Sequence, residues 1–234
     1  MKSTVVGLTL CCAGSAMAGP TGLNVIPTTD IVPSSSWIGG FANGNTSLSG
    51  TPFYRMPLIT AQSQFGLTPW LEAGLDYSQT SDLAHDSAIF NIKALVFSED
   101  EKRPNVAFGL ENVTMGQVPT YYVTLSKTLN YAQQMEERFK AHHRRNRKLL
   151  GQRVHLGMTL DGHKIAQPFA GTDLQLSESV VFQADWIRGT GNAATAGLAF
   201  VLPDQRSVLN PSILYFNGTN RFGFSLNFSH QFNF

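Results

Sequence analysis

The charged side chains that could take part in binding or catalysis stand at alternate positions of short segments, and these segments otherwise alternate apolar and polar residues. Positions two apart point to the same face of a β-strand, so these side chains are expected to share one enclosed face. Charges in an enclosed space must pair with each other or with water. The candidate cluster comprises Glu72, Asp76, Lys93, Glu111, Arg153, His155, Asp173 and Asp185. Two interpretations stay open, a polar pathway or binding site for a hydrophilic molecule and, as the favoured one, a structural salt-bridge network.

Catalysis requires a nucleophile with a base in reach, and the sequence offers no clear pair. His155 has no obvious serine beside it, and Ser229 and His230 are consecutive, so they point to opposite faces of a strand. His142 and His143 have no companions at metal-ligand spacing. No phosphate-binding loop or dinucleotide fingerprint is present. We therefore predict no catalytic residues, no metal and no cofactor, and a protein that is not an enzyme.

The C-terminal stretch RFGFSLNFSHQFNF shows most clearly the kind of strand from which this protein is built. From Phe222 to Phe234 the even positions are apolar except for His230, and the odd positions are small or polar without charge. Strict alternation over this length predicts a strand with one apolar and one polar face. A strand tilted across a bilayer needs about 9–11 residues, whereas an ordinary strand has about five or six. The stretch is typical of a strand with lipid on one side and a wet lumen on the other.

Similar alternation recurs through the chain. The expected strands are 37–45, 58–66, 70–78, 88–97, 106–112, 121–128, 153–160, 169–176, 180–188, 193–202, 208–216 and 222–234. An even number of strands returns both ends of the chain to one side of a barrel. Charged residues make up only 14% of the chain, the net charge is +1, and no apolar run reaches 18 residues, which disfavours helical membrane spans and nucleic acid as a partner. The predicted fold class is all-β: a transmembrane antiparallel β-barrel of about twelve strands, with a soluble secreted all-β protein as the alternative.

The first residues have the pattern of a secretory signal peptide. Lys2 precedes a short apolar run, and Ala16 and Ala18 form a small-x-small cleavage site. We expect residues 1–18 to be the signal peptide and to carry away Cys11 and Cys12. Residues 19–36 are then an extended lead-in, at the periplasmic mouth or tucked into the lumen, and 37–234 form the barrel. The expected location is the outer membrane of a Gram-negative bacterium.

Residues 130–150 break the strand pattern. This stretch lacks Gly and Pro, and Tyr131, Met135 and Phe139 recur every four residues, which predicts a short periplasmic helical insertion. Its basic patch consists of Arg144, Arg145, Arg147 and Lys148. A solvated insertion, a docking helix for a periplasmic partner and a helix lying on the anionic membrane surface remain as hypotheses.

The start of the mature chain resembles that of YjbH-type outer-membrane barrels, which are linked to exopolysaccharide production. The matching residues are Gly19, Gly22, Leu23, Pro27, Thr28 and Pro33. The pieces 103–112, 121–127 and 169–176 look similar to the same family. The chain departs from it in length, as a short single-barrel version, and at 183–186, where Asp185 is kept and the preceding acid is lost.

The resemblance implies a barrel accessory to the production or export of exopolysaccharide or another surface glycan. A general small-solute porin and a structural or assembly barrel with a filled lumen are the alternatives. Resemblance to outer-membrane barrels as a class implies that Phe228, Phe232 and Phe234 form the signal read by the barrel-assembly machinery. The expected partners are outer-membrane lipid, that machinery and polysaccharide or periplasmic export proteins, with no nucleic acid.

Overall fold

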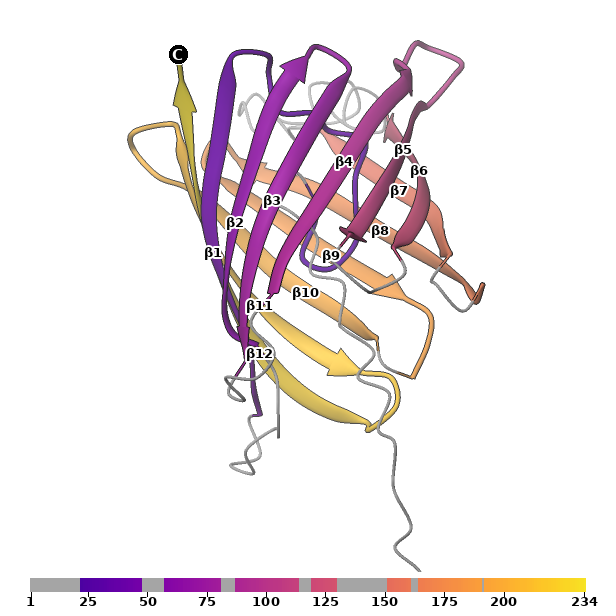
Figure 1. Cartoon of the computed structure of the whole chain (residues 1–234), viewed down its shortest axis with the longest axis vertical. Helices are drawn as coiled ribbons and strands as arrows, with labels where there is room; N and C mark the ends of the chain where they lie inside the picture. Colours follow the sequence, from indigo (N-terminus) through magenta and orange to yellow (C-terminus); the bar gives the residue numbers. More distant parts are fainter. Residues whose placement is uncertain are drawn as a thin grey trace, which may run out of the picture.

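The sheet closes on itself into one twelve-stranded antiparallel barrel (Figure 1). The computed structural model describes residues 22–47, 57–80, 87–113, 119–129, 151–160, 164–190 and 192–234. Each strand pairs with its neighbours in sequence, and β1 closes the ring against β12. The strands are β1 Ser36–Ser47, β2 Pro57–Thr68, β3 Leu71–Thr80, β4 Ser87–Phe97, β5 Asn105–Val113, β6 Thr120–Leu129, β7 Gln152–Leu160, β8 Ala166–Ser177, β9 Val180–Ile187, β10 Ala193–Val201, β11 Ser207–Phe216 and β12 Arg221–Asn233.

The predicted strand count and barrel architecture are therefore confirmed. The signal peptide 1–18 and the helical insertion 130–150, with its basic patch Arg144, Arg145, Arg147 and Lys148, lie outside the described residues and stay predictions. Within the described part of the chain, no helix is long and apolar enough to cross a bilayer.

The outer wall of the barrel is apolar. In β12 the side chains of Phe222, Phe224, Leu226 and Phe228 are exposed on the outside, whereas Ser225 is buried on the inside, as the alternation predicts. Phe41, Phe65, Leu75, Phe90 and further large apolar side chains are exposed in the same way around the ring. A soluble monomer rarely exposes so much contiguous apolar surface. The outer face is that of a barrel surrounded by lipid, and the soluble alternative does not fit it.

An aromatic stack covers the seam where β1 meets β12. The ring of Trp37 stacks on Phe232 at a centroid distance of 4.4 Å and on Phe65 of β2 at 6.0 Å. Its indole Nε1 donates a hydrogen bond to Ser63 Oγ at 2.6 Å. The indole lies over Gly39, where an added Cβ would come within 2.9 Å of the ring. The closing seam therefore depends on a large ring at Trp37 and on the absence of a side chain at Gly39.

The chain before β1 turns into the interior of the barrel, where Figure 1 shows it as an indigo loop. We call residues 22–35 the lumen segment. Leu23, Asn24, Val25, Ile26, Thr28, Thr29 and Val32 are all buried. Of the two placements expected for the lead-in, at the periplasmic mouth or inside the lumen, the structure shows the second. Apart from the parallel bridge Ser34↔Gly66, the lumen segment takes no part in the barrel's strand pairing.

Candidate functional site: the lumen and its N-terminal segment

The lumen segment spans the barrel from wall to wall. The backbone N–H of Val25 donates to Asp185 Oδ2 on β9 at 3.0 Å, and that of Val32 donates to Glu72 Oε2 on β3 at 2.8 Å. In the closed ring β3 and β9 are six strands apart in either direction, so they stand on opposite sides. Seven residues along the chain therefore cross the full width of the lumen.

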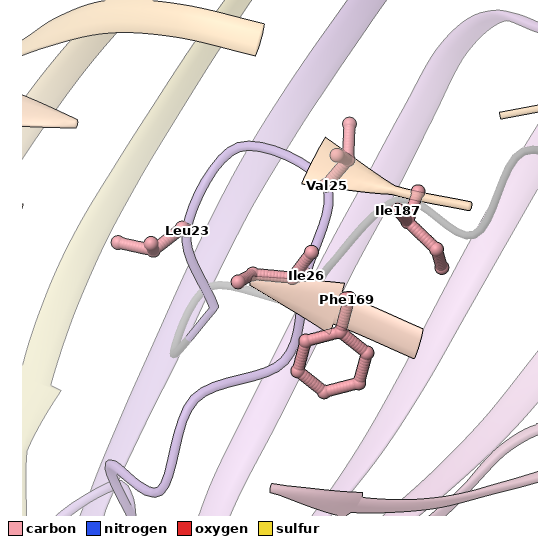
Figure 2. Close-up of a cluster of buried hydrophobic side chains, with 5 residues drawn as sticks. All are labelled: Leu23, Val25, Ile26, Phe169 and Ile187. Carbon is pink, nitrogen blue, oxygen red and sulfur yellow. The ribbon is translucent and has the colours of Figure 1, made fainter. Parts of the chain in front are cut away.

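An apolar cluster holds the first part of the lumen segment. Leu23, Val25 and Ile26 pack against Phe169 of β8 and Ile187 of β9 (Figure 2). The turn is closed by a hydrogen bond of 3.0 Å from Leu23 N–H to the Ile26 carbonyl oxygen. The hydrophobic effect is proportional to the apolar area removed from water. This cluster therefore stabilises the placement of Leu23, Val25 and Ile26 inside an otherwise polar lumen.

The wall makes room for this turn at Gly171 of β8. A Cβ added there would lie 2.6 Å from Ile26 Cδ1 and 2.9 Å from Leu23 Cδ1. Beside it, Asn24 Nδ2 donates to Thr195 Oγ1 at 2.9 Å, and the Thr195 hydroxyl donates to Asp185. The missing side chain at Gly171 and the two polar contacts together fit the wall to the shape of the turn.

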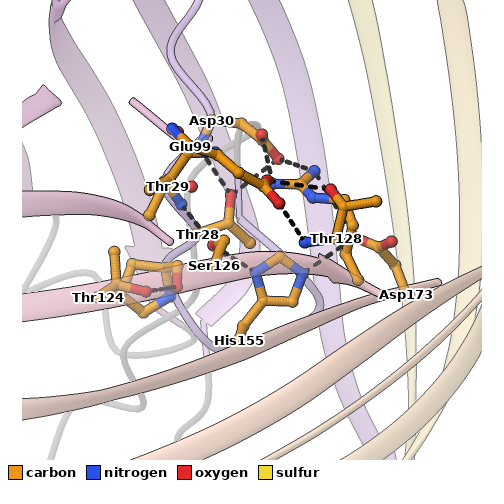
Figure 3. A network of polar contacts seen from close by, with 12 residues as sticks. Thr28, Thr29, Asp30, Glu99, Thr124, Ser126, Thr128, His155 and Asp173 are labelled. Atoms are coloured by element: carbon orange, nitrogen blue, oxygen red, sulfur yellow. Dashed lines mark hydrogen bonds and ion pairs between the residues drawn. The ribbon is translucent and has the colours of Figure 1, made fainter. Parts of the chain in front are cut away.

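A chain of hydrogen bonds holds the middle of the lumen segment (Figure 3). Thr29 N–H donates to Ser126 Oγ of β6 at 3.3 Å, and Ser126 Oγ lies 2.7 Å from His155 Nδ1 of β7. His155 Nε2 lies 3.0 Å from Asp173 Oδ2 of β8. Since the Ser126 oxygen accepts from Thr29, its proton is available to Nδ1, and we assign the remaining imidazole proton to Nε2, which donates to Asp173.

The expectation that His155 has no serine beside it is wrong. Ser126 comes from the neighbouring strand, where it stands directly opposite His155 in the β6–β7 register. A serine, a histidine and an aspartate in this contact resemble the catalytic arrangement of many hydrolases. Here both Ser126 and His155 are fully buried, and the Ser126 oxygen is already bound to the lumen segment. In this arrangement Ser126 holds the segment directly, and His155 and Asp173 hold Ser126 in place.

An ion pair fixes the next residues of the lumen segment. Arg153 on β7 forms two parallel hydrogen bonds to Asp30, of 3.0 Å from Nη1 and 2.8 Å from Nη2. Its Nη1 also lies 3.8 Å from Asp173 Oδ2. Burial raises the pKa of the Asp30 carboxyl, but the hydrogen bonds and positive charge of Arg153 outweigh burial, so the pKa is lowered from its ordinary 3.8. Bidentate pairs of this kind also define orientation.

A second group of the predicted cluster lies on β3, β4 and β5. Lys93 Nζ pairs with Glu72 Oε1 at 3.0 Å, and both side chains are almost completely buried. Asp76 accepts from Asn91 Nδ2 at 2.8 Å and from Ser63 N–H at 3.3 Å. Glu111 stands on β5 opposite Thr120 and is half-buried.

The structure thus divides the eight predicted residues rather than gathering them. Glu72, Asp76, Lys93 and Glu111 lie on the neighbouring strands β3 to β5, Arg153, His155 and Asp173 form another group, and Asp185 holds the turn at Leu23–Ile26. Sequence reasoning missed Ser126, Thr195, Asp30 and Thr124, whose hydroxyl donates to the Pro27 carbonyl oxygen at 3.2 Å. The alternation of β6 carried a signal for two of them, since Thr124 and Ser126 alternate with Val123 and Leu125. Among residues that the structure describes, no group of three His, Cys, Asp or Glu side chains could hold a metal ion.

A closed antiparallel barrel with an apolar outside and a polar, charged inside is a transmembrane β-barrel. Solved structures with a similar fold include a porin and another outer-membrane protein. The KdgM porin superposes with a TM-score of 0.51 at 8% identity, covering 85% of this chain and 99% of that one. Omp33 of Acinetobacter baumannii gives a TM-score of 0.52 at 7% identity, covering 85% and 98%. At these identities the similarity is one of fold.

A larger porin also matches in part. The Rhodopseudomonas blastica porin, solved as a triple mutant, gives a TM-score of 0.41 at 12% identity over 74% of this chain, which spans 55% of that protein's length. No protein-family model and no curated protein sequence matches this chain.

Proposed function

We propose that this protein is an outer-membrane porin for small hydrophilic solutes. The observation that carries the proposal is the closed twelve-stranded barrel with a polar lumen and an apolar outer wall, a fold similar to that of KdgM and Omp33. Export by the signal peptide 1–18 and insertion in the outer membrane of a Gram-negative bacterium belong to the same proposal.

The charges of the lumen favour neutral and cationic solutes. Among the described residues, the acidic side chains placed in it are Asp30, Glu72, Asp76, Glu111, Asp173 and Asp185, and the basic ones are Lys93, Arg153 and, on the same face of β12 as Ser225, Arg221. A cleft lined mainly by one sign of charge concentrates solutes of the opposite sign. KdgM porin has been solved in complex with disordered oligogalacturonate, whose sugar units carry carboxylates. The acidic excess in this lumen argues against such an anionic chain as the solute here.

Reconstitution in planar bilayers tests the proposal. We expect discrete conductance steps, and a reversal potential in a KCl gradient that shows preference for K⁺ over Cl⁻. Asp185→Asn with Glu72→Gln is expected to reduce this preference, and Ser225→Ala on the lumen face of β12 is the matched uncharged control. A barrel that folds and gives no conductance, with or without its lumen segment, would instead support a structural barrel with a filled lumen.

Other roles stay predictions. An accessory role in exopolysaccharide export rests on the resemblance at the chain's N-terminus, and the porin-like fold favours solute passage over it. We also propose that the protein is not an enzyme, because Ser126 is buried and its oxygen is occupied. Labelling of Ser126 in the intact protein by a fluorophosphonate would contradict this.

A further inference from the structure

We propose that the lumen wall is a peptide-binding site whose ligand is the lumen segment, and that the segment acts as a plug that leaves and re-enters while the barrel stays closed. The inference rests on the proposed porin function, since it describes how that lumen is closed.

The barrel does not need the lumen segment to complete its strand pairing. β1 pairs with β2 on one side and with β12 on the other, and the ring is closed from Ser36 onward. The segment contributes to the sheet the bridge Ser34↔Gly66 and the Ser35 carbonyl oxygen that accepts from Phe234 N–H, both near the start of β1. Its departure therefore breaks side-chain contacts and leaves the strand ladder, which satisfies the backbone in lipid, intact.

Three wall side chains recognise the segment through its backbone. Asp185, Ser126 and Glu72 accept hydrogen bonds from the amides of Val25, Thr29 and Val32, in that order along the segment. Acceptors for backbone N–H groups bind an extended peptide of almost any sequence, as when peptides add to exposed sheet edges. Sequence selectivity must come from elsewhere in the site.

Two features supply that selectivity. The cradle beside Gly171 receives Leu23 and Ile26 against Phe169, and Arg153 receives the carboxylate of Asp30. The preferred ligand is therefore a peptide with two apolar residues three positions apart, joined by a turn, and an acidic residue four positions further on. The chain's own residues 22–33, GLNVIPTTDIVP, have this pattern.

The charged groups of the wall keep partners when the plug leaves. Each charged wall group that binds the segment has a second partner on the wall: Glu72 has Lys93, Asp185 has Thr195 and Arg153 has Asp173. A charge left without any partner in an enclosed site would be costly. Because the partners stay behind with the wall, each of these charges keeps an ion pair or a hydrogen bond in an emptied lumen, which can fill with water.

Deleting residues 22–33 tests the inference. The variant is first shown to be a folded barrel by heat-modifiable migration in detergent, and its conductance in planar bilayers is then compared with that of the full chain. We expect the deletion to raise conductance at least several-fold. Addition of a synthetic peptide of residues 22–33 is expected to restore the block in a concentration-dependent manner.

Two controls define the specificity of the block. The same peptide with Leu23→Asp and Ile26→Asp should not block. Gly171→Leu in the deleted barrel should fill the cradle and abolish the block, whereas Ser225→Leu, which adds the same side chain on the lumen face of β12, should leave it. A deleted barrel that conducts but is not blocked by the peptide, or is blocked equally by both peptides, overturns the plug and leaves the porin standing. A folded deleted barrel that does not conduct overturns the porin itself.

A crosslink tests the same inference in the full-length mature chain, should the deletion prevent folding. Asn24→Cys with Thr195→Cys replaces two side chains whose polar atoms are 2.9 Å apart, and expression without residues 1–18 removes Cys11 and Cys12. We expect a silent channel when oxidised and openings after reduction. Equal conductance in both states would overturn the reversible plug.

Discussion

Ser126 and His155 stand opposite each other on β6 and β7, with 2.7 Å between Oγ and Nδ1, and both side chains are fully buried. The contact connects the wall to the segment, because Ser126 also accepts the Thr29 amide and His155 also contacts Asp173. In this chain the Ser126 hydroxyl and both imidazole nitrogens of His155 each have a partner. Loss of one member therefore leaves a neighbour unsatisfied in a buried place.

Ser126→Ala is expected to loosen the middle of the lumen segment. The substitution removes the acceptor of Thr29 N–H and the donor to His155 Nδ1, and an unsatisfied buried group costs about 1–3 kcal/mol. Hydrogen exchange at the Thr29 amide should become faster by about tenfold or more, with exchange in the barrel strands unchanged. Ser225→Ala on β12 is the control. Unchanged exchange at Thr29 would show that its hydrogen bond to Ser126 does not hold the segment.

Low pH should weaken the contact between Asp30 and Arg153. A carboxyl whose pKa is lowered in the folded state contributes stability that is complete above its unfolded pKa and is lost as the pH falls through the folded pKa. The lowered pKa of Asp30 therefore predicts a constant contribution at pH 5–8 and a loss below its ordinary 3.8. Exchange of the Asp30 amide, compared at matched intrinsic rates, should show the loss.

Asp30→Asn is the matched control for this pH dependence. An amide does not titrate, so the variant should hold its segment less firmly at pH 7 and lose the part of the pH dependence that the pair contributes. If the wild type and the Asp30→Asn variant show the same pH dependence of amide exchange between pH 2 and 5, the titrating group is not Asp30.

Gly39→Ala is expected to destabilise the β1–β12 seam. The added methyl would come within 2.9 Å of the Trp37 ring, which must then leave its stack on Phe232. Overpacking of this kind costs about 1–3 kcal/mol. The midpoint of urea unfolding from lipid vesicles should fall. Gly151→Ala is the matched control, since nothing lies within 4 Å of the Cβ it adds, and equal midpoints for the two variants would refute the packing argument.

Deletion of Phe234, or its replacement by a charged residue, is expected to lower the amount of assembled barrel without changing the assembled protein. Its side chain is 82% exposed and packs little, although its N–H donates to the Ser35 carbonyl oxygen at 3.1 Å. Phe228 and Phe232 complete the predicted assembly signal. The measurement is the heat-modifiable fraction in outer membranes. Normal assembly of the Phe234 deletion, together with failure of Phe224→Asp, would leave only lipid-facing packing as the role of these residues.

The sequence by itself determined the barrel and the face on which each side chain stands. Alternation in β12 predicts that Phe224 faces lipid and Ser225 the lumen, and the same rule places Glu72, His155 and Asp185 inside. The physical reason is local: successive side chains of an extended chain point to opposite faces, and a bilayer requires one apolar face.

Only the tertiary structure decided which lumen residues meet. Asp30 and Arg153 are 123 positions apart, and Val25 and Asp185 are 160 apart, so no local pattern connects them. Alternation predicts on which face of its strand a residue lies. It predicts neither the position of the strand around the ring nor the height of the residue along the lumen. Those depend on the register of every pair and on closure of β1 with β12, which place β3 opposite β9 and give the lumen segment its two walls.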